Sequence, residues 1–370
     1  MTENWPVCGR VAHLWGGAIA SNQPQNSSVV LWPSTLDGKK AEISLSMYQG
    51  FYNDINALGC QIIGVDFYTS ERQVVGVYPP EWRSCGLSKG SWINWEARQK
   101  WSEIAFHSAK SKNGLLFDLS NRIRYQLATV SEQLRHLSCT YQDQLRGKTV
   151  KGGFKPLVKF EDEFTQKIYI SFHSFLFDSC ILRDYLAEFV YNYSENGSRK
   201  VDGAKVTTAA GLVKKVLKKL KSQPNIVEQE FISITGEDGW LFKLGAYRDL
   251  IMHAAPIAIA RRKLFAICDT IDLLQDKKLP VIRCPLPQDP SLIARIRANR
   301  AEFNQYINIF EEFIKATDGE IAEFDCLQYA QAVSAQLADL SYKVMSLAPI
   351  SPQGIHLTEA DIIDLRIMND

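Results

Sequence analysis

The chain has 370 residues, of which 46% are apolar and 22% are charged, and 42 basic residues nearly balance 41 acidic ones. This composition excludes a collagen, a disordered tail and a disulfide-rich miniprotein. The net charge of +1 gives no whole-molecule attraction to nucleic acid or to a membrane, so a polyanion site has to be a local patch. The length favours two domains, and we place them at 1–94 and 95–370.

The sequence favours a cytoplasmic protein without a membrane anchor. Its first ten residues, MTENWPVCGR, lack a basic segment followed by an apolar one, so a secretory signal is not expected. The longest nearly uncharged apolar run, 250–260, is too short to cross a bilayer of about 30 Å. Eight cysteines are dispersed without a CxxC pair, which predicts reduced thiols, no metal site and no cofactor.

The first region, up to about residue 94, is typical of a small β-rich lobe. Short apolar or alternating runs predict strands over 28–32, 42–47, 61–69 and 73–78. Five tryptophans fall between Trp32 and Trp101. Such residues can line a ligand groove, but packing of the lobe and of its contact with the rest is the favoured interpretation.

Beyond residue 95 the apolar period becomes helical, with intervals of three and four residues sustained over several turns. The predicted helices cover 116–141, 168–193, 256–274, 291–315 and 326–347. The expected fold class is therefore mostly α, a bundle of long helices with a small β-rich N-terminal lobe. Strands are expected only within about the first 90 residues.

One candidate site lies in the segment GWLFKLGAYRDLIMHAAP, which contains Arg248, Asp249 and His253. Phosphate-binding loops, dinucleotide fingerprints, the GxSxG elbow and HExxH are absent from the sequence. In a continuous α-helix Arg248 and His253 are about 140° apart, so they converge only at a break or with help from a second chain. Pro256 makes such a break plausible.

These three residue types suit metal-free attack on a phosphodiester. A histidine moves protons near neutral pH, and a guanidinium stabilises an anionic phosphorane. Asp249, four residues before His253, can orient the imidazole. The structural alternative is a histidine at a helix end that is hydrogen-bonded to a carbonyl.

With this motif between two apolar helices, the segment 160–345 resembles the HEPN superfamily, whose signature is an arginine, a polar residue, a few positions and a histidine. The resemblance implies an RNase that pairs two protomers and cleaves RNA without metal through the ribose 2′-hydroxyl. It further implies a toxin or antiviral-defence effector, with the N-terminal lobe as a sensor or a contact for a regulatory partner protein. Two residues after His253, Ala255 replaces the tyrosine of the toxins that nucleotidyltransferase antitoxins modify. Asp249 replaces the asparagine that many members carry, which adds negative charge beside the phosphate site. Asp184 and Glu188 are candidates for the acid that several members place on an earlier helix.

A basic face supports an RNA partner. Between residues 199 and 221 eight basic residues face a single acid, and the face includes Lys214, Lys215, Lys218, Lys219 and Lys221. Apolar residues form the opposite stripe of an amphipathic helix. Phosphate contact, a membrane surface and plain solvation all remain open for this face.

Two rival functions follow from the same sequence. One is a non-catalytic helical module that binds a nucleotide or a partner protein through Arg248 and His253. The other is a two-lobed scaffold whose tryptophan-rich lobe recognises a peptide or a glycan.

Overall fold

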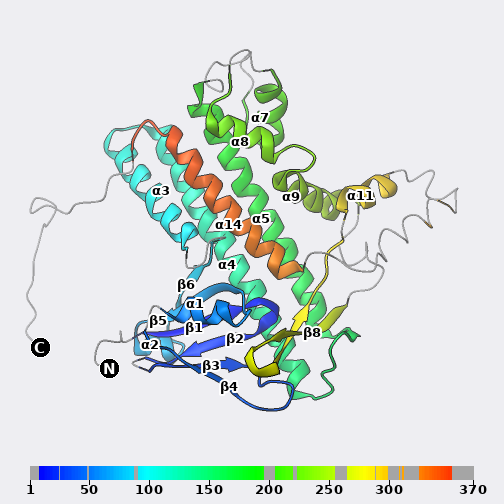
Figure 1. Ribbon diagram of the computed structural model, residues 1–370. Coiled ribbons are helices and arrows are strands. Elements are labelled where there is room, and N and C mark those ends of the chain that lie inside the picture. The colour runs from blue at the N-terminus through cyan, green and yellow to red at the C-terminus, as the bar shows by residue number, and fades with distance from the viewer. Residues whose placement is uncertain are drawn as a thin grey trace, which may run out of the picture.

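The computed structural model describes residues 8–24, 26–47, 50–86, 91–195, 205–219, 223–254, 265–287, 289–298, 308, 311 and 325–351. Long helices dominate these residues, and an antiparallel sheet lies against one end of them (Figure 1). The prediction of a mostly helical chain with a small N-terminal sheet is confirmed.

The N-terminal sheet has six antiparallel strands in the order β4-β3-β2-β1-β5-β6. Its strands are β1 (Gly9–Leu14), β2 (Ile19–Asn22), β3 (Ser28–Trp32), β4 (Ala41–Ser44), β5 (Ile62–Tyr68) and β6 (Glu81–Ser84). The predicted strands over 28–32 and 61–69 are confirmed, and the one over 42–47 begins and ends slightly earlier. Strands β1, β2 and β6 and the helix α1 (Gly50–Ala57) were not anticipated.

The predicted strand over 73–78 is wrong. Residues Glu71–Val74 form the short helix α2, and a turn with Gly76 at φ 80° follows. The side chain of Gln73 determines this outcome, because its Oε1 accepts hydrogen bonds from the backbone nitrogens of Thr69 and Ser70. A capping box of this kind starts a helix even where the apolar residues would suit a strand.

Four long helices run side by side and form the bundle (Figure 1): α3 (Ile93–Lys110), α4 (Gly114–Val150), α5 (Glu163–Tyr193) and α14 (Cys326–Val344). The helices predicted over 116–141, 168–193 and 326–347 are thus confirmed. Asp325 caps α14 and also accepts a hydrogen bond from the hydroxyl of Tyr141 at 2.7 Å, which ties α14 to α4.

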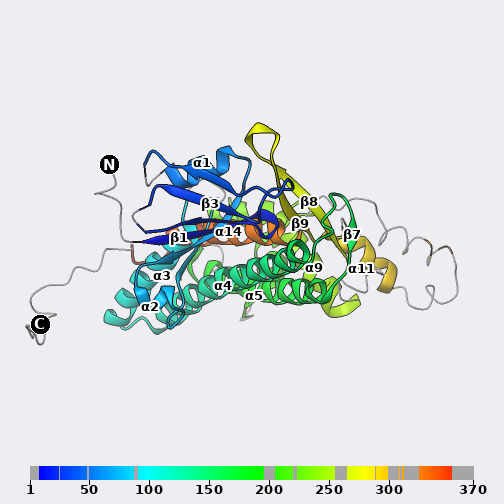
Figure 2. The ribbon, with the colours of Figure 1, turned by 90° about the horizontal axis from the view of Figure 1, so that it is seen from below.

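Sheet and bundle share one hydrophobic core, so the molecule is layered, with the sheet on one side of α4 (Figure 2). Leu14 and Ile63 of the sheet are as fully buried as Leu127 of α4. The boundary near residue 94 falls at the start of α3, while the division into two domains stays a prediction. Within the described residues, no helix is both long enough and apolar enough to span a bilayer.

A second sheet corrects the expectation that strands end near residue 90. It has three antiparallel strands, β7 (Lys159–Phe160), β8 (Ala266–Asp272) and β9 (Lys278–Arg283). The helix predicted over 256–274 is therefore wrong for 266–272, and 255–264 lie outside the described residues. The buried residues of β8 are Ala266, Cys268 and Ile271, an incomplete alternation over a stretch too short to be told from a helix by period alone.

Several short helices follow α5 in the chain. They are α7 (Ala209–Lys215), α8 (Ile226–Ile234), α9 (Trp240–Asp249), α11 (Pro290–Ala298), the 3₁₀ turn η2 (Leu217–Lys219) and the π-helical turn η3 (Leu250–Ala254). Of these, α7 and α9 pack directly against α5. The remaining 3₁₀ turns are η1 (Trp15–Gly17), η4 (Leu274–Asp276) and η5 (Met345–Leu347). Helix α11 begins one residue before the predicted 291–315 and covers its first part, and most of the later part is outside the described residues.

Candidate functional site

Helix α9 carries the Arg-Asp part of the predicted motif and is held firmly at its inner face. Leu241, Leu244 and Tyr247, spaced by three residues, are buried against the bundle. The Tyr247 hydroxyl donates a hydrogen bond of 2.7 Å to the carbonyl oxygen of Pro287. These contacts place Arg248 and Asp249 on the last turn of α9, where Arg248 follows Leu244 on the inner face and Asp249 is turned toward solvent.

The backbone then changes to a π-helix over Leu250–Ala254, which includes His253. A π-helix joins residues five apart by hydrogen bonds, so each residue turns the chain by less than the roughly 100° of an α-helix. Positions 248 and 253 are therefore closer in rotation than the 140° of a regular helix. The side chain of His253 lies outside the described residues. Such π turns occur frequently at functional sites.

Arg248 and Asp249 form an ion pair, with 3.4 Å between Arg248 Nε and Asp249 Oδ1. The Asp249 side chain is 57% exposed, whereas that of Arg248 is 27% exposed. Arg248 also acts on Cys180 of α5: burial raises the pKa of this thiol, and the positive charges of Arg183 and Arg248 oppose the rise.

A cavity of about 500 Å³ opens beside Asp249, between α5, α7, α9 and α11. Its charged lining consists of Arg183, Lys214, Lys218 and Asp249. Positive charge remains in excess even when Asp184, which pairs with Arg183 at 3.0 Å, is counted with Asp249, so the cavity suits an anion. The structure thus brings two of the predicted RNA-binding lysines next to the motif acid.

Helix α7 owes its position beside this cavity to Asp184 of α5. The Asp184 carboxylate accepts hydrogen bonds of 3.0 Å from the backbone nitrogen of Ala209 and from Nε of Arg183. Thr208 caps the same helix through Gly211 N. Burial would lower the pKa of Arg183, but Cys180 and the carboxylates of Asp184 and Asp249 raise it above its ordinary value. Arg183 therefore stays charged at the cavity wall.

The other predicted site residues lie elsewhere. Lys215 and Lys219 are exposed but are not among the residues that line this cavity, and Lys221 lies outside the described residues. Glu188 pairs with Arg122 of α4 at 3.0 Å, so it is a structural acid rather than part of the site. Sequence reasoning missed Arg183, and its only signal was its position directly before Asp184.

A second cavity, of about 890 Å³, lies on the other side of α9. Trp240, Phe242 and Tyr329 contribute aromatic rings to its lining, and Lys243 and Arg295 contribute positive charge. Acidic residues line it too, among them Asp289, which caps α11 through Leu292 N at 2.8 Å. This cavity is therefore more aromatic and less cationic than its neighbour.

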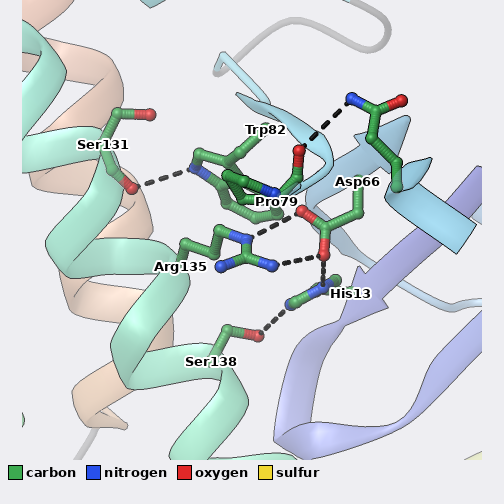
Figure 3. A network of polar contacts seen from close by, with 8 residues as sticks. His13, Asp66, Pro79, Trp82, Ser131, Arg135 and Ser138 are labelled. Carbon is green, nitrogen blue, oxygen red and sulfur yellow. Dashed lines mark hydrogen bonds and ion pairs between the residues drawn. The ribbon is translucent and has the colours of Figure 1, made fainter. Parts of the chain in front are cut away.

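A different polar cluster, at the junction of sheet and bundle, contains the three residue types of a catalytic triad (Figure 3). His13 Nδ1 lies 3.1 Å from Ser138 Oγ, and His13 Nε2 lies 3.3 Å from Asp66 Oδ2. Arg135 of α4 adds two hydrogen bonds to the Asp66 carboxylate, of 2.8 and 2.9 Å. Burial would raise the pKa of Asp66, but the bonds from His13 and Arg135 lower it below its ordinary value.

This cluster is closed to substrate. Ser138, His13 and Asp66 are 0%, 2% and 3% exposed, and Trp82 covers the His13 ring at a centroid distance of 4.9 Å. A nucleophilic serine needs room for a reacting carbonyl beside its oxygen. The cluster therefore holds β1 and β5 on α4 as a structural clamp, and we name it the His13–Asp66 clamp.

The tryptophans follow the packing interpretation. Trp101 is fully buried, and Trp82 donates its indole N–H to the carbonyl oxygen of Ser131 at 2.9 Å. Trp92 makes edge contacts with Tyr52 and Phe67. Their rings therefore fasten the lobe together and to α4.

Within the described part of the chain, no group of three or more His, Cys, Asp or Glu side chains is placed to hold a metal ion. No family model, curated protein or solved structure matches the chain. The interpretation of the site therefore rests on its own residues and their arrangement.

Proposed function

We propose that the chain is a metal-independent endoribonuclease of the HEPN type, in which Arg248 and His253 act on the RNA phosphodiester. One observation carries the proposal: the π-helical turn that follows Arg248 reduces the angle between positions 248 and 253, beside a cavity with excess positive charge. An arginine, a histidine and an anion-attracting cavity are the parts that such cleavage needs.

In the proposed reaction the ribose 2′-oxygen attacks the adjacent phosphorus and the bond from phosphorus to the 5′-oxygen breaks. An imidazole takes the 2′-hydroxyl proton, and the departing 5′-oxygen receives a proton. The products are a 2′,3′-cyclic phosphate and a 5′-hydroxyl. Arg248 stabilises the extra negative charge of the phosphorane, and Asp249 supports the cationic imidazole of His253.

Assembly enters the proposal through the family resemblance, which implies a homodimer with two Arg–His sets at one RNA groove. The α-helical angle had supplied a separate reason for a second chain. The π turn weakens that reason, because it reduces the angle between positions 248 and 253 within one chain. The role as a toxin or antiviral effector, with a regulatory partner at the N-terminal lobe, likewise belongs to the resemblance.

The test is incubation of the purified protein with total RNA, with and without EDTA, beside His253→Ala and Arg248→Ala. Each variant is expected to lower cleavage at least about a hundredfold, the usual scale for losing general acid–base catalysis. Arg248→Lys is expected to rescue poorly, since lysine lacks the planar donor pair. EDTA is expected to leave the rate unchanged.

Cleavage that needs a divalent ion, or that persists in His253→Ala, would overturn the assignment. Circular dichroism of each variant keeps loss of activity separate from loss of fold. A folded protein that cuts no RNA would favour the non-catalytic binding module instead.

A further inference from the structure

The two cavities beside α9 meet along one ridge. Phe242 and Ala246 of α9, four residues apart on one helical face, and Ser291 of α11 line both of them. Phe242 is 42% exposed, so an aromatic ring is open to solvent at the line where the cavities join. A ligand lying across the ridge would contact the linings of both cavities at once.

One cavity is basic and the other is aromatic, as the binding sites for the phosphate and for the base of a nucleotide would be. On one side Arg183, Lys214 and Lys218 outnumber the single carboxylate of Asp249, as a phosphate site requires. On the other side Trp240 and Tyr329 give an aromatic wall. Unstacked bases bind to proteins by stacking on such rings, and every base has a face for this contact.

We propose that this ridge is a nucleotide subsite, in which a base stacks on Phe242 and its phosphate occupies the basic cavity. Each of the two cavities, of about 890 and about 500 Å³, has a volume within the usual range for small-ligand sites. The proposal extends the proposed ribonuclease function to residues that take no part in bond cleavage. A nucleotide of single-stranded RNA and a free nucleotide present the same chemistry here.

The aromatic half is tested by fluorescence anisotropy with a 5′-fluorescein RNA of ten nucleotides, in a His253→Ala background so that the probe stays intact. Phe242→Ala is expected to weaken binding about tenfold, within the range of base–aromatic stacking, while Phe242→Tyr retains it. Phe177→Ala is the matched control, because Phe177 is 38% exposed on α5 and does not line either cavity. Equal losses for Phe242→Ala and Phe177→Ala would overturn the proposal.

The cationic half has a control within the same short segment. Lys214→Gln with Lys218→Gln is expected to weaken binding about tenfold at moderate salt and to reduce the salt slope by about two phosphate contacts. Lys215→Gln with Lys219→Gln removes the same charge from residues outside the cavity lining, and is expected to change affinity less than about twofold. Equal losses for the two pairs would mean that the lysines act only as diffuse charge and would overturn the subsite.

Competition with AMP distinguishes the two sources of the nucleotide. Displacement of the RNA by AMP, lost in Phe242→Ala, supports a site that also accepts the free ligand. Binding of RNA with the same Phe242 dependence but without AMP competition supports a subsite of an RNA path. Cleavage by the chain with His253 intact is measured separately, so failure of the ribonuclease proposal and failure of this subsite give different results.

Discussion

The His13–Asp66 clamp and the cavity beside Asp249 contain similar side chains in very different surroundings. In the clamp, the Asp66 carboxylate accepts three hydrogen bonds and its side chain is 5% exposed. Beside the cavity, Asp249 has one ion pair of 3.4 Å and is 57% exposed. Charge that is neutralised inside the protein stabilises the fold, whereas charge left unbalanced at an opening is available to a ligand.

The comparison also shows why residue types alone mislead. The clamp has the serine, histidine and aspartate of a hydrolase within about hydrogen-bond distance, but Ser138 contacts Nδ1 of His13 and Asp66 contacts Nε2, the reverse of the hydrolase arrangement. It also lacks access for a substrate. The α9 site has a less familiar set of residues, but it opens on two cavities.

The largest expected difference between the regions is in stability. Asp66→Ala leaves the buried His13 and the partly buried Arg135 without their shared carboxylate, so we expect the free energy of unfolding to fall by about 3–5 kcal/mol. Asp249→Ala is the matched control and is expected to change it by no more than about 0.5 kcal/mol. Urea unfolding followed by circular dichroism measures both, and equal effects would break the comparison.

The same aspartate predicts a pH dependence. Because His13 and Arg135 lower its pKa in the folded state, Asp66 contributes stability above its ordinary pKa of about 3.9. That contribution is lost as pH falls through the lower pKa of the folded protein. The stability difference between the native chain and Asp66→Asn should therefore be full at pH 7 and shrink in acid below about pH 4. A difference that grows in acid would show that the assigned direction is wrong.

A smaller loss of stability is expected from Gly64→Ala in β5. A Cβ at this position would lie 2.2 Å from the Trp82 ring, so the ring that covers His13 has to move. Overpacking of this kind costs about 1–3 kcal/mol. Gly38→Ala controls for the loss of a glycine, since a Cβ there would meet no described atom within 4 Å, although its φ of 80° adds backbone strain. Thermal unfolding measures both variants. A larger loss of stability for Gly64→Ala than for Gly38→Ala would show that the clamp needs the Trp82 ring in its present position.

The smallest expected effect is at the open site. Asp249→Asn removes the one carboxylate that lines the basic cavity, so RNA affinity is expected to rise about two- to fivefold at low salt. The gain should fade as salt is raised, because exposed charges are screened. Anisotropy titrations at two salt concentrations measure it, and an unchanged or reduced affinity would mean that the Asp249 charge is not felt by the ligand.

The sequence predicted the long helices because their apolar spacing persists over many turns, as in α4 and α5. It missed β8 and β9 because each is short and β9 contains Pro280, a residue that weakens a strand prediction. Over six or seven residues the spacing of apolar side chains does not separate a strand from a helix. It is the antiparallel pairing of β8 with β9 that identifies them as strands.

The same limit applies to the sites. Arg248, Asp249 and His253 are close in sequence, so their motif was visible. Lys214 and Lys218 were visible as part of a basic run. That these two lysines line the cavity while Lys215 and Lys219 do not depends on where α9 and α11 pack. The clamp joins residues 13, 66 and 135, which come from three elements, and no local pattern connects them.

The η1 turn limits how the sheet can communicate with the rest of the molecule. Gly17 has φ 86°, and a Cβ there would lie 2.6 Å from the carbonyl oxygen of Tyr141 in α4. Two backbones in direct contact leave no layer of side chains that could slide or repack. At this point the sheet therefore cannot shift along α4 without moving the α4 backbone, and any side chain at position 17 would push the two layers apart.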